Sequence, residues 1–304
     1  MLPSYSCIRG DISLRSLRLC VKLLRVQTPR ISASSYSNTA PLVWSFLYGR
    51  NHGKVEIILD NAPARSAELL AQDRVDAALV PVIAYQTIEN ARLIPDVCVG
   101  ARERVRSVCL VTKGEDLQNV RVVALDVSSQ TSVVLTKIIF REFLGFEPEW
   151  KNAEPNLDAM LSDADCALLI GDPALLIADS GMRSADSKTK DQRPKTEVRK
   201  FDLAELWHQH TGLGFVFAMW MTRQNGCEID FTAARDEGLA HLDEIVASYE
   251  TDIRLGRGEM RKYLSQNISY SVDESMRRGM ELYFELAAKN GLIEENKPLF
   301  FTAD

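Results

Sequence analysis

Short apolar runs alternate with helical patterns along most of the chain. Strands are expected at residues 31–33, 54–59, 76–81, 106–112, 121–125 and 165–170, with helices at 41–47, 67–72, 82–89, 133–144 and 174–178. Strands and helices that alternate at this pitch form parallel βαβ units whose sheet is covered by helices. The pattern therefore predicts an α/β protein.

The rhythm changes in the second half of the chain. Residues 180–200 are polar and charge-rich, which predicts an exposed loop. A helical turn is expected at 201–207 and an apolar strand at 211–221. Within that strand, Gly212 and Gly214 favour a close approach of the backbone to a neighbour, or a hinge.

Two lobes separated by a cleft are the expected architecture. Residues 30–112 together with 219–304 form the first lobe, and residues 113–218 form the second. The chain crosses between them near Thr112 and returns through the apolar strand, and the helical residues 230–290 cover the first lobe. Two crossings and a cleft make a hinge that closes on a small ligand.

Three predicted strands run into polar turns at the start of a helix. The turns are residues 35–39, 126–132 and 171–173, and Pro41 follows the first turn at a position where proline is favoured. Free N–H groups and the positive end of a helix dipole suit an anion such as a carboxylate or phosphate. An ordinary helix cap at residues 37–39 is the alternative. Ligands gather at the carboxyl ends of such strands, so we expect the turns to wall one cleft.

Composition narrows the class of protein. The chain of 304 residues is 46% apolar and 26% charged, as in an ordinary globular protein. Its net charge of −6 argues against non-specific nucleic-acid binding, and it contains no apolar run of the roughly 18 residues that span a bilayer. The six cysteines have no metal-ligand spacing and predict reduced thiols in the cytoplasm.

The first 29 residues stand apart from this pattern. They contain several arginines and a single acid, Asp11, and residues 13–26 have the pattern of a basic amphipathic helix. We expect a poorly ordered tail produced by a translation start placed too far upstream, the chain proper beginning near Thr28. A transit peptide is the alternative.

Six motifs resemble one enzyme family in their order along the chain. They are Ser35–Leu42, Asp76–Pro81, Val105–Val108, Asp126–Ser132, Ile170–Pro173 and Trp207–Trp220. Together they resemble the chorismate dehydratases, the first enzymes of the futalosine route to menaquinone. The resemblance implies a two-lobed, type 2 periplasmic-binding-protein-like fold and conversion of chorismate to 3-[(1-carboxyvinyl)oxy]benzoate and water, with no metal or organic cofactor. Ser37 and Gly214 depart from it, since the family usually has Leu and Pro there.

The candidate site residues come from the motifs and the strand-end turns. The resemblance implies that Asn38 and Ser107 are catalytic, and that Ser128, Ser129 and Thr131 form a carboxylate clamp in the second lobe. The full set of candidate substrate-binding residues is Ser35, Tyr36, Thr39, Pro81, Ser128, Ser129, Thr131, Ser132, Gly171, Asp172, Thr211 and Gly212. For Pro81, Thr211 and Gly212 a purely structural role is the alternative.

These motifs contain no His or Lys to act as a general base. The histidines at positions 52, 208, 210 and 241 lie outside them, and Asp172 precedes a proline, which is typical of a turn and cap residue. Our hypothesis, which the resemblance also implies, is that the substrate's own enolpyruvyl carboxylate takes the C3 proton. Asn38 and Ser107 would hold that carboxylate and the departing hydroxyl.

Other functions remain open at this point. A non-catalytic solute-binding protein for a small carboxylate would have the same fold, and a ligand-sensing domain is conceivable. The related 1,4-dihydroxy-6-naphthoate synthase is also two-lobed, but it uses a His, for which no predicted strand end offers a candidate. The expected partner is a small-molecule substrate, and neither nucleic acid nor membrane is expected. The sequence does not specify the oligomeric state.

Overall fold

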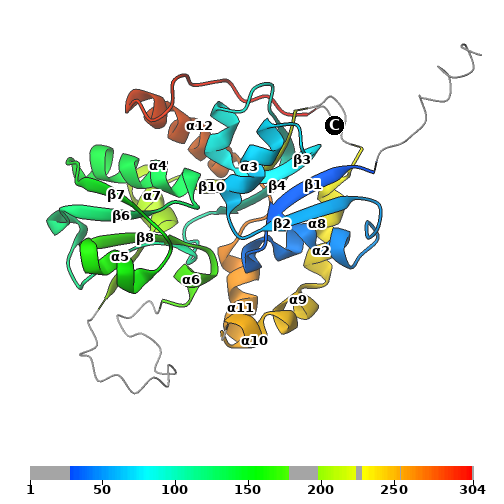
Figure 1. Ribbon diagram of the computed structural model, residues 1–304, viewed down its shortest axis with the longest axis horizontal. Helices are drawn as coiled ribbons and strands as arrows, with labels where there is room; N and C mark the ends of the chain where they lie inside the picture. Colours follow the sequence, from blue (N-terminus) through cyan, green and yellow to red (C-terminus); the bar gives the residue numbers. More distant parts are fainter. Residues whose placement is uncertain (1–27, 178–197, 224–227, 254, 303–304) are drawn as a thin grey trace, which may run out of the picture.

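The computed structural model describes residues 28–177, 198–223, 228–253 and 255–302. It forms two α/β lobes, each built on a five-stranded sheet (Figure 1). This arrangement confirms the predicted fold class. The expectations for residues 1–27 and for most of the 180–200 loop lie outside the described residues.

The sheet of the first lobe is mainly a set of parallel βαβ units. Its strands, in spatial order, are β2 (Glu56–Asp60), β1 (Arg30–Ser34), β3 (Ala77–Pro81), β10 (Phe215–Thr222) and β4 (Arg92–Ala101). Strand β1 pairs in parallel with β2 and β3, as expected. Strand β10 runs antiparallel between β3 and β4, because it returns from the second lobe.

The second sheet repeats this arrangement. Its spatial order is β7 (Glu149–Ala153), β6 (Val122–Asp126), β8 (Cys166–Ile170), β5 (Val108–Thr112) and β9 (Arg199–Asp202). Strand β6 pairs in parallel with β7 and β8, and β5 is antiparallel to β8 and β9. The carboxyl ends of β1 and β6 are therefore the equivalent positions in the two lobes.

The crossings between lobes differ from the expected boundaries. Strand β5 was placed at the end of the first lobe, but it pairs with β8 and β9 in the second, so the chain crosses before Val108 and not near Thr112. All of β10 pairs within the first sheet, so residues 215–218 belong to the first lobe. An apolar strand carries no local signal for the sheet it joins, since its partners lie far away along the chain.

Helices pack against both sheets and join the lobes. Around the sheets lie α2 (Ala40–Leu47), α3 (Pro63–Ala71), η3 (Val82–Gln86), η4 (Leu117–Asn119), α4 (Gln130–Ile138) with its π-helical continuation η5 (Ile139–Leu144), α5 (Leu157–Asp163), α6 (Gly171–Leu175) and α7 (Leu203–Thr211). The C-terminal region supplies α8 (Phe231–Ala240), α9 (Leu242–Ser248), α10 (Glu250–Ile253), α11 (Arg257–Lys262), the π-helical turn η6 (Tyr263–Asn267) and α12 (Glu274–Lys289).

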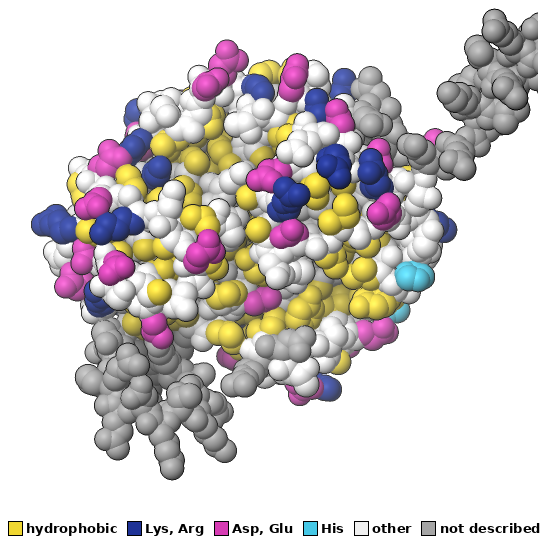
Figure 2. All heavy atoms as spheres, in the orientation of Figure 1, with side chains coloured by type: hydrophobic (Ala, Val, Ile, Leu, Met, Phe, Trp, Pro, Cys, Tyr) yellow, Lys and Arg dark blue, Asp and Glu magenta, His cyan; other side chains and the backbone are white. Residues whose placement is uncertain are grey.

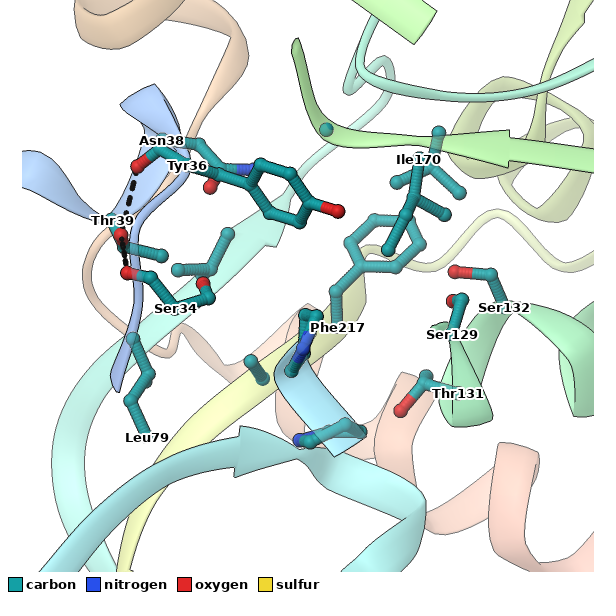
Figure 3. Close-up of a pocket in the computed structure, with 16 residues that line it drawn as sticks. Ser34, Tyr36, Asn38, Thr39, Leu79, Ser129, Thr131, Ser132, Ile170 and Phe217 are labelled. Carbon is teal, nitrogen blue, oxygen red and sulfur yellow. Dashed lines mark hydrogen bonds between the residues drawn. The ribbon is translucent and has the colours of Figure 1, made fainter. Parts of the chain in front are cut away.

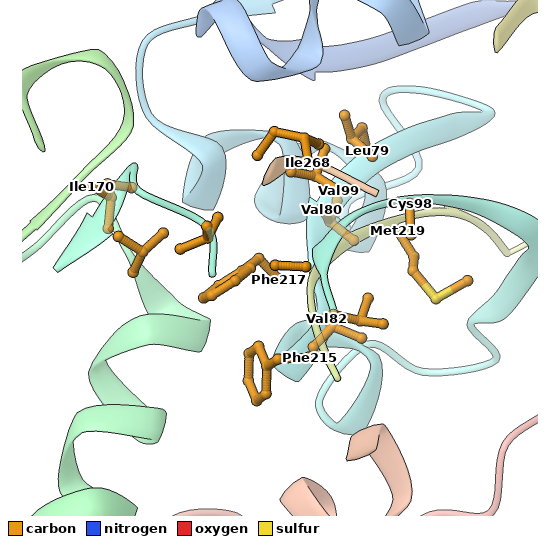
Figure 4. Packing of buried hydrophobic residues seen from close by; sticks show 14 of the residues in the cluster. Leu79, Val80, Val82, Cys98, Val99, Ile170, Phe215, Phe217, Met219 and Ile268 are labelled. Carbon is orange, nitrogen blue, oxygen red and sulfur yellow. The ribbon is translucent and has the colours of Figure 1, made fainter. Parts of the chain in front are cut away.

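The C-terminal helices cover the first lobe, and one of them also contacts the second. Helix α8 packs on α2 and β4, whereas α12 packs on both β10 and α4 (Figure 1). The Tyr283 hydroxyl of α12 donates to the Thr131 carbonyl oxygen of α4 at 2.9 Å. One hydrophobic cluster runs through both lobes and includes Phe217 of β10 and Ile170 of β8 (Figure 4). The relative position of the lobes is thus set by packing.

Close packing of α2 on α8 depends on Gly238. A Cβ at this position would lie 1.9 Å from the Pro41 carbonyl oxygen. Gly238→Ala is therefore expected to lower the free energy of unfolding by about 1–3 kcal/mol, the usual cost of overpacking. Gly258→Ala is the matched control, because a Cβ on Gly258 meets nothing within 4 Å. Urea denaturation checks both variants, and wild-type stability of Gly238→Ala would contradict this packing.

The visible surface mixes charges of both signs. In Figure 2, Lys and Arg side chains alternate with Asp and Glu over both lobes, with apolar atoms between them. Among the helices of the described residues, none combines the length and the apolar character that crossing a membrane requires.

Candidate active site

A cavity with an empty volume of about 530 Å³ lies between the lobes (Figure 3). The 16 residues that line the cavity are all uncharged at neutral pH. They are Ser34, Tyr36, Asn38, Thr39, Pro63, Leu79, Pro81, Val99, Val108, Ser129, Thr131, Ser132, Ile170, Gly171, Phe217 and Ala218. Eight of them are among the candidates named from the sequence.

The first lobe contributes the segment between β1 and α2. The 3₁₀ turn η2 (Ser37–Thr39) joins the two, and Pro41 occupies the first turn of α2, as expected. The Thr39 hydroxyl stabilises this turn, because it lies 2.6 Å from the Ser34 carbonyl oxygen. Asn38 is 8% exposed and lines the cavity. The polar turn after β1 therefore presents a helix start and an amide side chain to the site.

The second lobe contributes the start of α4. Its N-cap residue, Ser129, makes no side-chain hydrogen bond to the helix, so the first-turn N–H groups have no side-chain cap. Ser129 and Ser132 are buried and point into the cavity in Figure 3. Thr131 lines it as well, and its hydroxyl oxygen accepts a hydrogen bond from the Ile83 N–H of the first lobe at 3.3 Å. Two helix starts thus face one cavity from opposite lobes.

Tyr36 of the first lobe lines the cavity and reaches the second lobe. Its ring lies over Gly171 of the second lobe, where a Cβ would come within 2.7 Å of the ring. Gly171 has a φ of +66°, a left-handed conformation that glycine adopts without strain. Burial raises the pKa of Tyr36, and interaction with the Ser128 side chain lowers it. The phenol therefore stays protonated at neutral pH and can donate a hydrogen bond.

Hydrogen bonds between Ser37 of the first lobe and Asp172 of the second join the lobes outside the cavity. The Ser37 hydroxyl donates to the Asp172 carboxylate at 2.5 Å, and the Ser37 N–H donates to the same carboxylate at 3.2 Å. Burial raises the pKa of Asp172, whereas the hydrogen bonds from Ser37 lower it. A leucine at position 37 could not donate through its side chain, so this departure from the family pattern adds an inter-lobe contact.

Ser107 lies immediately behind the cavity wall. It is 0% exposed, its carbonyl oxygen accepts from the Gly171 N–H at 2.7 Å, and the next residue, Val108, lines the cavity. The preceding residue, Arg106, has a φ of +65°, and its N–H donates to Asp202 at 2.5 Å. The buried Asp202 carboxylate therefore helps to hold the crossing segment that carries Ser107.

Four further candidates lie outside the cavity wall. The Ser35 hydroxyl donates to Asn61 at 2.5 Å, and Ser128 is hydrogen-bonded to the carboxylate at the end of β6 at 2.6 Å. Thr211 and Gly212 instead close α7: the Thr211 hydroxyl donates back to the helix backbone at 2.8 Å, and Gly212 has a φ of +69°. The apolar strand starts only at Phe215, because α7 extends further than the sequence indicated.

The histidines lie away from the cavity. His52 is exposed, and Nδ1 of His208 lies 3.3 Å from a backbone carbonyl oxygen. His210 and His241 stack on aromatic rings, with centroids 4.4 Å and 3.8 Å apart respectively. Each therefore has a structural or surface environment, as the sequence analysis expected.

Sequence analysis did not find the apolar wall. Phe217, Val99, Leu79 and Ile170 line the cavity, but each looks like an ordinary core residue of a buried strand. The apolar pattern alone could not separate a side chain that faces the cavity from one packed in the core. Among the polar residues of the wall, only Ser34, at the end of β1, was not predicted. Its position next to the polar turn at residues 35–39 could have identified it.

Comparison with known proteins agrees with the fold. A chorismate dehydratase from Thermus thermophilus is 33% identical over 234 residues, which cover 75% of this chain and 85% of that protein. Protein AF1704 from Archaeoglobus fulgidus has a similar structure, with a TM-score of 0.64 at 16% identity over 87% of this chain and 98% of that one. The periplasmic aliphatic sulphonate binding protein SsuA from Escherichia coli gives a TM-score of 0.57 at 14% identity, over 91% and 94%.

The structural neighbours confirm the two-lobed periplasmic-binding-protein fold that the resemblance implied. Residues 29–289 match the family model described as menaquinone biosynthesis, which covers both lobes and every residue of the cavity wall. The chain therefore belongs to the menaquinone biosynthesis family.

Proposed function

We propose that this protein is a chorismate dehydratase, a carbon–oxygen hydro-lyase that forms 3-[(1-carboxyvinyl)oxy]benzoate and water in the futalosine route to menaquinone. The observation that carries the proposal is the inter-lobe cavity, in which two helix starts and a set of uncharged donors face each other. Membership of the family and the 33% identical chorismate dehydratase support the choice of substrate.

The polar groups of the cavity wall suit a small dianion. Chorismate carries two carboxylates. The start of α2 offers one of them a positive dipole end, and the start of α4 offers the other a dipole end together with N–H groups that have no side-chain cap. Asn38 would serve the carboxylate nearer the first lobe, and Ser129 and Ser132 the one nearer the second. The apolar wall, with Phe217 at its centre in Figure 3, would exclude water from the ring. Neutral donors in a dry site interact more strongly with charge than they would in water.

The dehydration of chorismate requires little of the protein beyond orientation of the substrate. Loss of the C3 proton and the C4 hydroxyl makes the ring aromatic, so the driving force is in the substrate itself. We assign the proton transfer to the enolpyruvyl carboxylate, because the residues that line the cavity are uncharged. Asn38, which lines the cavity, would hold that carboxylate and stabilise the departing hydroxyl. Ser107 lies behind the cavity wall, and its catalytic role stays a prediction from the resemblance. Tyr36, which is half-buried and protonated, is a further donor at the boundary between lobes.

Incubation of the purified protein with chorismate tests the function directly. We expect a new aromatic absorption and a product with the mass of chorismate less one water. Binding without turnover would instead indicate a solute-binding protein, the reading that the fold alone would also allow. A protein inert toward chorismate but active on a later intermediate would indicate the related naphthoate synthase.

The described cysteines are free thiols, as is typical of proteins in a reducing compartment. Cys98, Cys109 and Cys166 are free and buried, and burial raises the pKa of Cys98 and Cys166, which keeps both thiols protonated. We therefore assign the activity to the cytoplasm, which subcellular fractionation followed by the dehydratase assay would test.

A further inference from the structure

The start of helix α4 is held in place by groups that come from the first lobe. Thr131, in the first turn of α4, lines the cavity. Its carbonyl oxygen accepts a hydrogen bond from the Tyr283 hydroxyl of α12 at 2.9 Å, and its hydroxyl oxygen accepts one from the Ile83 N–H of η3 at 3.3 Å. The second-lobe half of the cavity wall is thus tied to two elements that pack on the sheet of the first lobe (Figure 1).

The surroundings of Tyr283 leave its hydroxyl little freedom. The side chain is 0% exposed, and its ring packs in a T-shaped arrangement with Phe215 of β10 and Trp207 of α7, with centroids 5.0 Å and 6.4 Å away. Helix α12 is itself anchored to the segment between α7 and β10, because the Gly214 N–H donates to the Ser275 hydroxyl at 3.0 Å. A hydrogen bond from a donor fixed in this way sets the position of the turn that accepts it.

The turn that Tyr283 holds is the one that would bind an anion. The first-turn N–H groups of α4 have no side-chain cap, and a carboxylate is a suitable partner for them. The proposed function places the enolpyruvyl carboxylate of chorismate against Asn38 in the first lobe, which leaves the ring carboxylate for α4. Donors act well on a charge only when their neighbours hold them within about 0.5 Å of the productive geometry.

We infer that Tyr283 is a positioning residue for the ring carboxylate of chorismate. Its hydroxyl holds the first turn of α4 through the Thr131 carbonyl oxygen, and so aims the N–H groups of that turn at the carboxylate. Tyr283 is not one of the residues that line the cavity, so it acts through the backbone of α4. This inference rests on the proposed function, since it names the part of the substrate that the second lobe binds.

Tyr283→Phe tests the inference, because it removes one oxygen atom and keeps the aromatic ring. We expect KM for chorismate to rise about 3- to 10-fold, the loss typical of one hydrogen bond. The change in kcat should stay within about twofold, because the ring carboxylate takes no proton and is bound alike before and during the reaction. Steady-state kinetics measures both constants.

Tyr85→Phe is the matched control. Tyr85 is also buried, and its hydroxyl donates to the Pro298 carbonyl oxygen at 2.6 Å, but it is not part of the cavity wall. Both variants lose a buried hydrogen bond to a backbone carbonyl, so both should have a lower Tm than wild type. Only Tyr283→Phe should raise KM.

Two fragments of the product separate positioning from a general loss of structure. 3-Hydroxybenzoate keeps the ring carboxylate, and 2-phenoxyacrylate keeps the enolpyruvyl carboxylate. In calorimetric titrations, Tyr283→Phe should bind the first fragment about 3- to 10-fold more weakly than wild type does, and the second with unchanged affinity.

Four results would each overturn the inference: equal weakening of both fragments, an unchanged KM, an equal rise in KM in Tyr85→Phe, or a Tyr283→Phe variant that does not fold. Failure of the wild-type protein to turn over chorismate is a different result, which would overturn the proposed function and this inference with it.

Discussion

Asn38→Ala is expected to lower kcat/KM for chorismate about 10²- to 10³-fold, the loss typical of removing one preorganised donor to a developing negative charge. Asn38 lines the cavity at the start of the first lobe's helix, and the other residues of the wall are uncharged, so no cation replaces the lost amide. Steady-state kinetics with chorismate, monitored through the aromatic product, measures the change.

His210→Ala is the control for this variant. His210 stacks on Phe143 with ring centroids 4.4 Å apart and lies outside the cavity wall, so its removal should leave kcat within about twofold of wild type. A histidine variant that stays folded and loses as much activity as Asn38→Ala would contradict proton transfer by the substrate. Full activity of Asn38→Ala would remove Asn38 from the site.

Gly171→Ala is expected to lower kcat/KM about 10- to 100-fold. The new Cβ would lie 2.7 Å from the Tyr36 ring, so the ring would have to leave its place between the lobes. The φ of +66° adds backbone strain of about 1–3 kcal/mol. Displacing Tyr36 both removes a donor and opens the contact between the first lobe and the strand end that carries Gly171. Product binding measured by calorimetry, together with kinetics, checks this expectation.

Gly212→Ala is a close match for Gly171→Ala. Gly212 has a φ of +69°, so an alanine there has the same backbone strain as at Gly171. Its Cβ, however, would meet nothing within 4 Å. Both variants should lose stability, and only Gly171→Ala should lose affinity and turnover. Equal loss of activity in the two would show that strain, and not the ring of Tyr36, is responsible.

Local pattern predicted the repeating units of the fold but not their partners. The strands at β1, β3, β6 and β8 are apolar and bounded by turn residues, and all were expected. Strand β4 was missed because Pro95 and Asp96 interrupt its apolar run. Strands β7 and β9 are short, largely polar edge strands, which look like loops. The lobe to which β5 belongs depends on pairing with β8 and β9, which no local pattern encodes.

The polar half of the site was easier to predict than the apolar half. A turn rich in Ser, Thr and Asn between a strand and a helix is a specific signal, and it located Asn38, Ser129 and Ser132. Phe217 could not be assigned, because a cavity wall and a core have the same composition.

A crystal structure of the protein with bound 3-[(1-carboxyvinyl)oxy]benzoate tests the central claim most directly. One carboxylate of the product should lie against Asn38 at the start of α2, and the other against the N–H groups and hydroxyls at Ser129–Ser132. A product molecule bound in the cavity beside Arg102, or with either carboxylate paired to a Lys or Arg side chain, would contradict the account.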